Sequence, residues 1–211
     1  MARAFADIAF TDSVKEIQVC YGSRNVYSGL AFDLDQSDRL TEFEINFLSE
    51  SDSFYLGTVG ENGWPYVQHR GGPKGVLQVL DDKTIAYAEF NGNQQYISLG
   101  NIHANEKVLL FVMDYPNRRR LKIWARAQLV DANINVELIA RMNNLEYPAR
   151  ADRAVLLSVE AIDWNCPQHI TQRFSNAEIA QVLTPLLEEN HMLKLQLAQA
   201  LKNTKTYGES P

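Results

Sequence analysis

The sequence predicts a mainly β protein of the α+β class, an antiparallel barrel or sandwich followed by an amphipathic C-terminal helix. Several predicted strands between residues 53 and 130 are joined by hairpin signals, and one helix is inserted between two of them. This order favours an antiparallel sheet over strands that alternate with helices. The chain has 211 residues, 45% of them hydrophobic, which suffices for one sizeable core.

The N-terminal fifty residues combine helical and loop signals. A short helix is expected after Thr41, which can cap it because Glu44 occupies the capping-box position. Residues 53–59 predict the first strand. The Gly-Glu-Asn-Gly sequence at 60–63 is typical of a hairpin turn, and residues 64–69 predict the partner strand.

The same patterns continue to residue 162, with turns expected at Asp81-Asp82-Lys83 and Tyr115-Pro116-Asn117. Further strands are predicted at residues 75–80, 84–88, 107–113, 119–130 and 154–162, and helices at residues 93–104 and 133–144. No second turn-rich shift in composition follows. We therefore expect one domain over residues 1–175, a helix over 176–203 and a polar tail over 204–211.

A heptad pattern marks the C-terminal helix. Its seam consists of Ile179, Leu183, Leu186, Asn190, Leu193, Leu197 and Ala200. Asn190 is a polar residue on that seam, where such a residue fixes register and strand number in coiled coils. Leu187 widens the apolar stripe, as in an amphipathic helix that lies on its own barrel. Both interpretations remain open from the sequence.

Composition excludes several classes of function. The net charge of −6 disfavours a strongly basic nucleic-acid binder. Cys20 and Cys166 are far apart, which excludes a CxxC redox pair and a thiolate zinc site, and the four histidines lack metal-ligand spacing, so no metal site is expected. Hydrolase, P-loop and dinucleotide motifs are absent. No apolar run reaches signal-peptide or membrane-spanning length, so we expect a soluble cytoplasmic protein without a membrane partner.

Three polar clusters are candidates for a binding site. The first is His69, Arg70, Gly71 and Gly72 at a strand end. The glycines allow a backbone to approach a flat ligand closely, and Arg70 adds a fixed positive charge. A bulged strand end, bent by the two glycines, explains the same residues without a ligand.

The second cluster, residues 91–101, opens a helix with amide and hydroxyl side chains, and helix N-termini attract anions. Ordinary capping by Asn91 or Asn93 explains part of it. The third cluster, residues 164–169 followed by Arg173, is a donor-rich stretch after an apolar strand. A tryptophan such as Trp164 is most often a packing residue there.

Together these clusters resemble the pyridoxamine 5'-phosphate oxidase-like, FMN-binding split-barrel family, in particular its oxidase-related bacterial subgroup. The most specific combination is Gln-His-Arg-Gly-Gly-Pro at 68–73 with Asn-Cys-Pro-Gln-His-Ile at 165–170. The resemblance covers most of the chain between about residues 50 and 175. It implies a six-stranded antiparallel split β-barrel with flanking helices, which forms a homodimer with two FMN sites at the subunit interface.

The resemblance also implies which residues contact the cofactor. His69, Arg70, Gly71 and Gly72 would lie beside the flavin ring, and Arg120 would contact it from a neighbouring strand. Asn93, Gln95, Ser98 and Asn101 would lie near the phosphate and ribityl chain. The partner subunit would supply Trp164, Asn165, Gln168, His169 and Arg173.

Two departures from the family pattern bear on function. Gln94 stands where the subgroup often has arginine, which weakens FMN binding unless Arg70 or Arg173 supplies the charge. Residues 170–174 replace the Arg-x-His pair with which the vitamin oxidases bind their substrate. A true pyridoxamine-phosphate oxidase is therefore disfavoured.

The leading hypothesis is an FMN-dependent oxidoreductase that acts on a small organic substrate. The alternative is a non-catalytic flavin-binding or sensor dimer, favoured by Gln94 and the heptad helix, and a third interpretation is haem handling. No residue stands out as an obligatory acid or base, and His69 and His169 are the only candidates.

Overall fold

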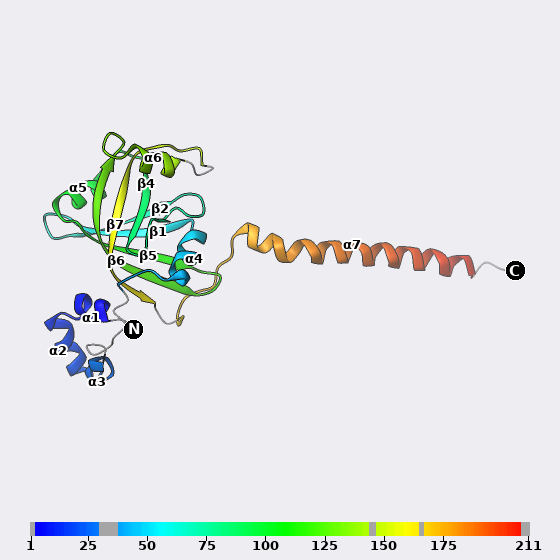
Figure 1. Ribbon diagram of the computed structural model, residues 1–211. Helices are drawn as coiled ribbons and strands as arrows, with labels where there is room; N and C mark the ends of the chain where they lie inside the picture. Colours follow the sequence, from blue (N-terminus) through cyan, green and yellow to red (C-terminus); the bar gives the residue numbers. More distant parts are fainter. Residues whose placement is uncertain (1–2, 30–37, 144–146, 165–166, 208–211) are drawn as a thin grey trace. The chain divides into compact units, whose positions relative to one another are not determined.

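The computed structural model describes residues 3–29, 38–143, 147–164 and 167–207. The chain divides into two compact units, Met1–Ile170 and Thr171–Pro211. The first unit contains a curled antiparallel sheet with helices against its ends and faces (Figure 1). The second unit contains one long helix.

Within the described residues the sheet has seven strands, in the order β2-β1-β5-β6-β7-β4-β3. The strands are β1 (Ser53–Val59), β2 (Pro65–Gly71), β3 (Gln78–Val79), β4 (Thr84–Phe90), β5 (Lys107–Asp114), β6 (Arg119–Asp131) and β7 (Ala151–Trp164). β2 and β3 are the two edges, so the sheet is not closed. The predicted antiparallel split-barrel fold is confirmed, and the strand beyond the expected six is the two-residue β3.

The first hairpin forms as the sequence predicts. β1 and β2 pair from Ser53 opposite Gly71 to Val59 opposite Pro65. In the turn, the Gly63 N–H donates to the Gly60 carbonyl at 2.8 Å, and Gly63 adopts a φ of 81°. A glycine meets this backbone requirement without the steric cost of a side chain.

The helices of the first unit are α1 (Arg3–Ala9), α2 (Asp12–Cys20), α3 (Arg24–Ser28), α4 (Glu42–Glu50), α5 (Ile97–Ala104) and α6 (Val136–Asn143). Of these, α1, α4, α5 and α6 pack against the sheet, and α2 packs against α3. The main core lies inside the curled sheet, with Leu56, Leu110 and Leu121 fully buried. A second cluster forms where α6 packs Leu138 and Met142 against β4 and β7.

The predicted helix after Thr41 is α4, and its capping box is present. The Thr41 N–H donates to Glu44 Oε2 at 2.9 Å. The other carboxylate oxygen, Oε1, accepts a hydrogen bond from Trp164 Nε1 at 2.7 Å. The Trp164 ring also packs against Phe43 and Phe47, with ring centroids 5.0 and 4.8 Å away. One buried carboxylate thus connects the start of α4 to the end of β7.

The strand predicted at residues 75–80 is mostly not a strand. Gly75 has a φ of 76°, and its N–H donates to the Ser51 carbonyl at 2.9 Å, so the chain bends around the end of α4. Val76 and Leu77 are buried in the core. Their apolar character therefore serves packing, and only Gln78–Val79 pairs with β4.

Asp114, the last residue of β5, has a carboxylate whose contribution to stability depends on pH. Burial alone would raise the pKa of Asp114, but hydrogen bonds from Asn117 and Arg119 outweigh it and hold that pKa below its ordinary value of 3.8. The folded state therefore binds a proton less readily than the unfolded state. This contribution to stability is present above pH 3.8 and is lost as the pH falls through the lowered pKa.

Asp114→Asn is expected to lower the free energy of unfolding at pH 7 by about 1–2 kcal/mol, because the charge-assisted hydrogen bonds are lost. The difference between wild type and variant should shrink as the pH falls below 3.8. Urea unfolding measured across this pH range checks it. A difference that stays constant with pH contradicts the assignment.

The second unit contains α7 (Asn176–Tyr207), four residues longer than predicted at its C-terminal end. Its start is capped, because the Ser175 hydroxyl accepts from the Glu178 N–H at 3.2 Å and the Ser175 N–H donates to the Glu178 carboxylate at 2.7 Å. Pro185 lies inside the helix. Among the described residues, no helix has both the length and the apolar character needed to span a bilayer.

Candidate functional site

A pocket of about 170 Å³ lies where β2, the end of β4 and the start of α5 approach one another. Polar side chains dominate its wall, which β7 completes with one arginine. The lining residues are Gln68, Arg70, Glu89, Phe90, Asn91, Gly92, Asn93, Gln94, Tyr96, Ser98, Leu99 and Arg153. Of the predicted site residues, the structure brings together Arg70, Asn93 and Ser98 in this donor pocket.

Side chains along β2 point alternately toward the donor pocket and away from it. Gln68 and Arg70 line the pocket, whereas His69 and Gly71 occupy the intervening, more exposed positions. Successive strand residues point to opposite faces of a sheet. The His69 ring instead contacts the Tyr55 ring at 5.4 Å. Within one chain, His69 and Gly71 therefore face away from this pocket.

Side-chain hydrogen bonds join α5 to both strands of the first hairpin. The buried Ser98 hydroxyl donates to Gln68 Oε1 at 2.8 Å, which leaves the Gln68 amide N–H groups available to a ligand. Asn101 Nδ2 donates to Thr58 Oγ1 at 2.9 Å. Asn101, a predicted phosphate contact, thus anchors the helix to β1 and does not line the pocket.

The loop before α5 has an unusual backbone. Gln94 and Tyr96 adopt φ values of 56° and 53°, in the left-handed region that side chains other than glycine rarely occupy. The Gln95 N–H donates to Asn93 Oδ1 at 3.1 Å, a local turn that competes with helix formation. The helix therefore begins at Ile97 rather than at Asn93 as predicted. Its first N–H groups, which lack intrahelical partners, lie beside the donor pocket.

Arg70 does not provide the free positive charge that the sequence suggests. Its Nη1 lies 2.8 Å from Glu89 Oε1, and the two side chains are only 14% and 11% exposed. Glu89 was missed because the strand predicted at 84–88 ends one residue before it. Three atoms of this cluster are buried without a hydrogen-bond partner among the described residues: Arg70 Nε, Glu89 Oε2 and Tyr87 Oη. Burial raises the pKa of Tyr87, so its hydroxyl stays neutral.

A second cation reaches the pocket from β7. Arg153 pairs directly with Glu89 in the β4–β7 register. Its Nε donates to Asp131 Oδ1 at 3.2 Å, and its guanidinium lies 5.8 Å from the centroid of the Tyr96 ring. No motif marked Arg153 in the sequence, because it enters the site through strand pairing between distant segments.

Packing within the chain itself explains the glycine at position 72. Its N–H donates to the Asp52 carbonyl at 2.9 Å, and a Cβ at this position would lie 2.9 Å from Val76 Cγ2. The close packing requires a glycine. The β1–β2 register is regular up to Gly71, so the bulged strand end that the sequence left as the alternative does not occur among the paired residues.

The other predicted site residues do not line the donor pocket in one chain. The Arg120 guanidinium lies 5.2 Å from the centroid of the Phe111 ring, and Trp164 is held by α4. Gln95 contacts Asn93, with Asn93 Nδ2 donating to Gln95 Oε1 at 3.3 Å.

The remaining residues of the third cluster lie elsewhere. Gln168 and His169 are exposed, Arg173 belongs to the second unit, and Asn165, like Cys166, lies outside the described residues. The roles implied for these residues in a partner subunit's site stay predictions.

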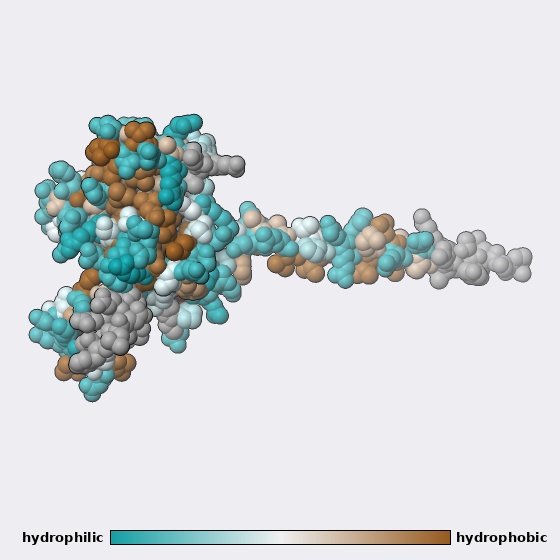
Figure 2. Space-filling view, viewed as in Figure 1, coloured by the Kyte–Doolittle hydropathy of each residue, from teal (hydrophilic) through white to brown (hydrophobic). Residues whose placement is uncertain are grey.

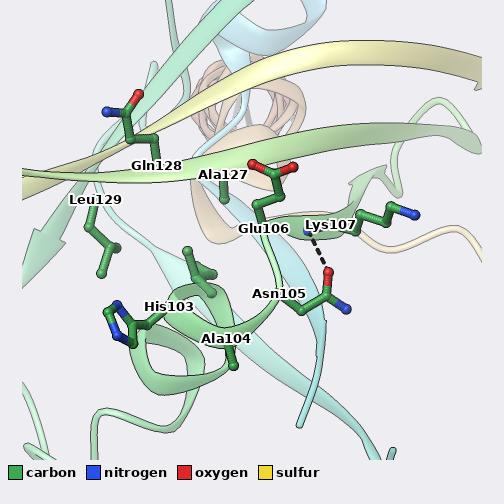
Figure 3. A pocket seen from close by; sticks show the side chains of 9 residues that line it. His103, Ala104, Asn105, Glu106, Lys107, Ala127, Gln128 and Leu129 are labelled. Carbon is green, nitrogen blue, oxygen red and sulfur yellow. Dashed lines mark hydrogen bonds between the residues drawn. The ribbon is translucent and has the colours of Figure 1, made fainter. Parts of the chain in front are cut away.

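A larger depression of about 550 Å³ lies between the end of α5, the start of β5 and β6, and contains no predicted site residue (Figure 3). The polar ends of His103, Lys107 and Gln128 point in different directions in this view rather than toward a common centre. Glu106 is neutralised by Arg126. Although larger, this depression lacks convergent donors, so the donor pocket is the better candidate site.

The residues of the donor pocket fit one end of FMN. The volume of the donor pocket is below the roughly 300–1,000 Å³ of pockets that enclose whole ligands. Amide donors, the first N–H groups of α5 and Arg153 match a phosphate. Glu89 Oε2, which has no hydrogen-bond partner among the described residues, is an acceptor. It therefore suits ribityl hydroxyls, which can donate, and not a phosphate. The donor set thus fits the phosphate and ribityl end of the cofactor.

Comparisons with solved structures give matches of limited extent. HupZ from group A Streptococcus is 18% identical over 64% of this chain and 100% of that chain, with a TM-score of 0.49. A candidate pyridoxamine 5'-phosphate oxidase from Lactobacillus delbrueckii is 26% identical over 60% and 94%, with a TM-score of 0.45. A pyridoxamine 5'-phosphate oxidase-related, FMN-binding protein from Nostoc punctiforme is 13% identical over 58% and 78%, with a TM-score of 0.41.

No curated protein matches the sequence. The family comparison is decisive. Residues 40–164, more than half of the chain, match the family model described as pyridoxamine 5'-phosphate oxidase. This range begins just before α4 and ends with the last residue of β7. The chain therefore belongs to the pyridoxamine 5'-phosphate oxidase family.

Proposed function

We propose that the protein binds FMN and acts as an oxidoreductase on a small organic molecule. The observation that carries the proposal is the donor pocket, in which side chains from β2, β4, β7 and the start of α5 converge. Membership of the family supports a flavin as the ligand. The FMN-binding part would be the split-barrel domain, residues 1–175.

Different pocket residues would bind the phosphate and the ribityl chain of FMN. Gln94, Arg153 and the first N–H groups of α5 would hold the phosphate, while the Gln68 amide and Glu89 Oε2 would bind the ribityl hydroxyls. Bound FMN supplies hydride and electron transfer at its ring. Ser98 fixes the Gln68 amide, and the Arg70–Glu89 pair fixes the position of the carboxylate.

We further propose that the functional unit is a homodimer. The pocket of one chain is too small to enclose FMN, and Gln168 and His169 are exposed in the single chain. A second copy could supply these residues, together with Trp164, Asn165 and Arg173, to the ring end of the site.

Arg153→Gln is expected to weaken FMN binding about tenfold to a hundredfold, because a charge-assisted contact to the phosphate is lost. FMN titration, followed by flavin absorbance and fluorescence, measures the change in Kd. Arg126→Gln is the matched control, since Arg126 is also an arginine of the sheet with acidic partners, Glu106 and Glu160, but lies outside the pocket. Equal Kd values for wild type and Arg153→Gln, or a wild-type protein that binds no FMN, would overturn the proposal.

The opposite substitution tests the departure from the subgroup pattern. Gln94→Arg is expected to tighten FMN binding about tenfold, because a guanidinium replaces a neutral amide in the pocket wall. The same titration measures it, with Gln95→Arg as the control because Gln95 does not line the pocket. Unchanged affinity in Gln94→Arg would place the phosphate elsewhere.

One observation favours the non-catalytic alternative. The charge of Arg70 is compensated by Glu89, so this arginine offers little stabilisation to a negatively charged reduced flavin. Steady-state reduction by NADPH, with oxygen and quinone acceptors, separates the two functions. Rapid turnover supports the oxidoreductase, and stable FMN binding without turnover supports the sensor.

A further inference from the structure

The long helix α7 presents an unusual amount of apolar surface. Ile179, Leu183, Leu186, Leu193 and Leu197 are 42–61% exposed. Figure 2 shows apolar side chains in patches along this helix. Exposed apolar side chains that recur along one side of a helix mark a surface that another element covers.

We propose that α7 pairs with α7 of a second copy as a parallel, in-register, two-stranded coiled coil. The spacing assigns Leu183, Asn190 and Leu197 to the a positions of the heptad. The d positions are then Ile179, Leu186, Leu193 and Ala200. All seven belong to the single continuous helix.

Asn190 indicates the orientation. In a parallel, in-register pair it lies opposite the Asn190 of the other copy, and the two amides hydrogen-bond to each other. In an antiparallel pair, an a residue faces d residues of the partner, which here are isoleucine, leucine and alanine. The amide would then be buried without a partner, at a cost in free energy. The seam therefore favours the parallel arrangement and a dimer.

The flanking charges point the same way. Glu189 occupies a g position and Lys194 the following e position. In a parallel coiled coil, a g residue faces the e residue five positions later on the partner, so Glu189 meets Lys194 twice. Within one helix, residues five apart point about 140° away from each other, so the two side chains cannot pair in the same chain.

Pro185 is compatible with this arrangement. It occupies a c position, on the outside of the seam, and it deprives the helix of one backbone hydrogen bond. A long helix with an internal proline is poorly stable by itself and depends on packing along its apolar face. A second copy supplies that packing.

Cysteine cross-linking of the full-length protein tests the pairing. In a Cys20→Ser, Cys166→Ser background, Leu183→Cys and Leu197→Cys are introduced separately, each at a residue seven positions from Asn190. Both variants are expected to form disulfide-linked dimers under mild oxidation.

Mixing Leu183→Cys with Leu193→Cys or with Ala200→Cys should give few mixed links, because these positions are at least ten residues apart in a parallel, in-register pair. Preferential 183–193 or 183–200 links, which join an a position to a d position, would indicate antiparallel helices. Failure of both the same-position and the mixed links would indicate a helix packed on its own chain. Either outcome overturns the proposal.

Charge reversal in the Leu197→Cys background is an independent test of the Glu189–Lys194 contacts. Glu189→Lys places lysine opposite Lys194, and Lys194→Glu places glutamate opposite Glu189. When differently tagged single variants are mixed, both contacts become attractive. Random pairing gives two mixed dimers for each dimer of one variant. The proportion of mixed dimers should exceed this 2:1 value by at least about threefold. A random proportion contradicts the predicted g–e contacts.

This inference does not depend on the proposed flavin chemistry. FMN titration of the same variants reports on the donor pocket separately. Loss of same-position cross-links with unchanged FMN binding removes the coiled coil alone. Cross-links in a protein that binds no FMN remove the proposed function alone.

Discussion

Arg70→Met is expected to lower the free energy of unfolding by about 3 kcal/mol, because it leaves a buried carboxylate unpaired. Arg70 and Glu89 are 14% and 11% exposed, and their Nη1 and Oε1 atoms are 2.8 Å apart. Glu89 Oε2 already lacks a partner among the described residues, so the carboxylate has little alternative solvation. Urea unfolding, followed by circular dichroism, measures the change.

The double variant Arg70→Met, Glu89→Leu is expected to recover most of this stability, since replacing both charges avoids the unpaired ion. Arg126→Met, which breaks exposed ion pairs with Glu106 and Glu160, should cost less than about 1 kcal/mol. If the double variant is as unstable as Arg70→Met, the interaction between the two side chains is not the cause.

Trp164→Ala is expected to cost about 3–5 kcal/mol, because the indole packs against two rings of α4 and donates to a buried carboxylate. Trp164→Phe keeps the ring packing and loses only the hydrogen bond to Glu44. It should cost about 1.5–3 kcal/mol. Thermal and urea unfolding measure both variants.

Trp64 provides the matched control, since it is 74% exposed and Trp64→Phe should leave stability unchanged. FMN titration of Trp164→Phe addresses the predicted cofactor contact. Reduced stability with unchanged FMN affinity assigns Trp164 to packing. Unchanged stability with a large loss of FMN affinity contradicts the packing role and supports a contact with the cofactor.

Short-range signals predicted most of the fold. The capping box of Thr41 and Glu44 defined the start of α4, and the Asn62-Gly63 dipeptide defined the first hairpin, because both depend on contacts within four residues. A strand was predicted over residues 75–80, but Val76 and Leu77 are buried without strand pairing. An apolar run has the same appearance whether it pairs or only packs.

The site was less predictable because its parts meet through long-range pairing. Arg70, Asn93 and Ser98, which line the donor pocket, were expected from their motifs and from the family resemblance. Glu89 and Arg153 become neighbours only through the β4–β7 register, which no local pattern records. The left-handed backbone at Gln94 was equally hidden, since such conformations are held by surrounding structure rather than by the residue's own preference.

The carboxylate of Glu44 holds Thr41 through one oxygen and Trp164 through the other, across 120 positions of sequence. Hydrogen bonds to one side chain therefore hold the two ends of the family-matched segment close together. Such adjacency of ends permits circular permutation. A short linker from residue 164 back to residue 41, with new termini opened in the exposed turn at residues 61–63, should give a barrel that folds in permuted order.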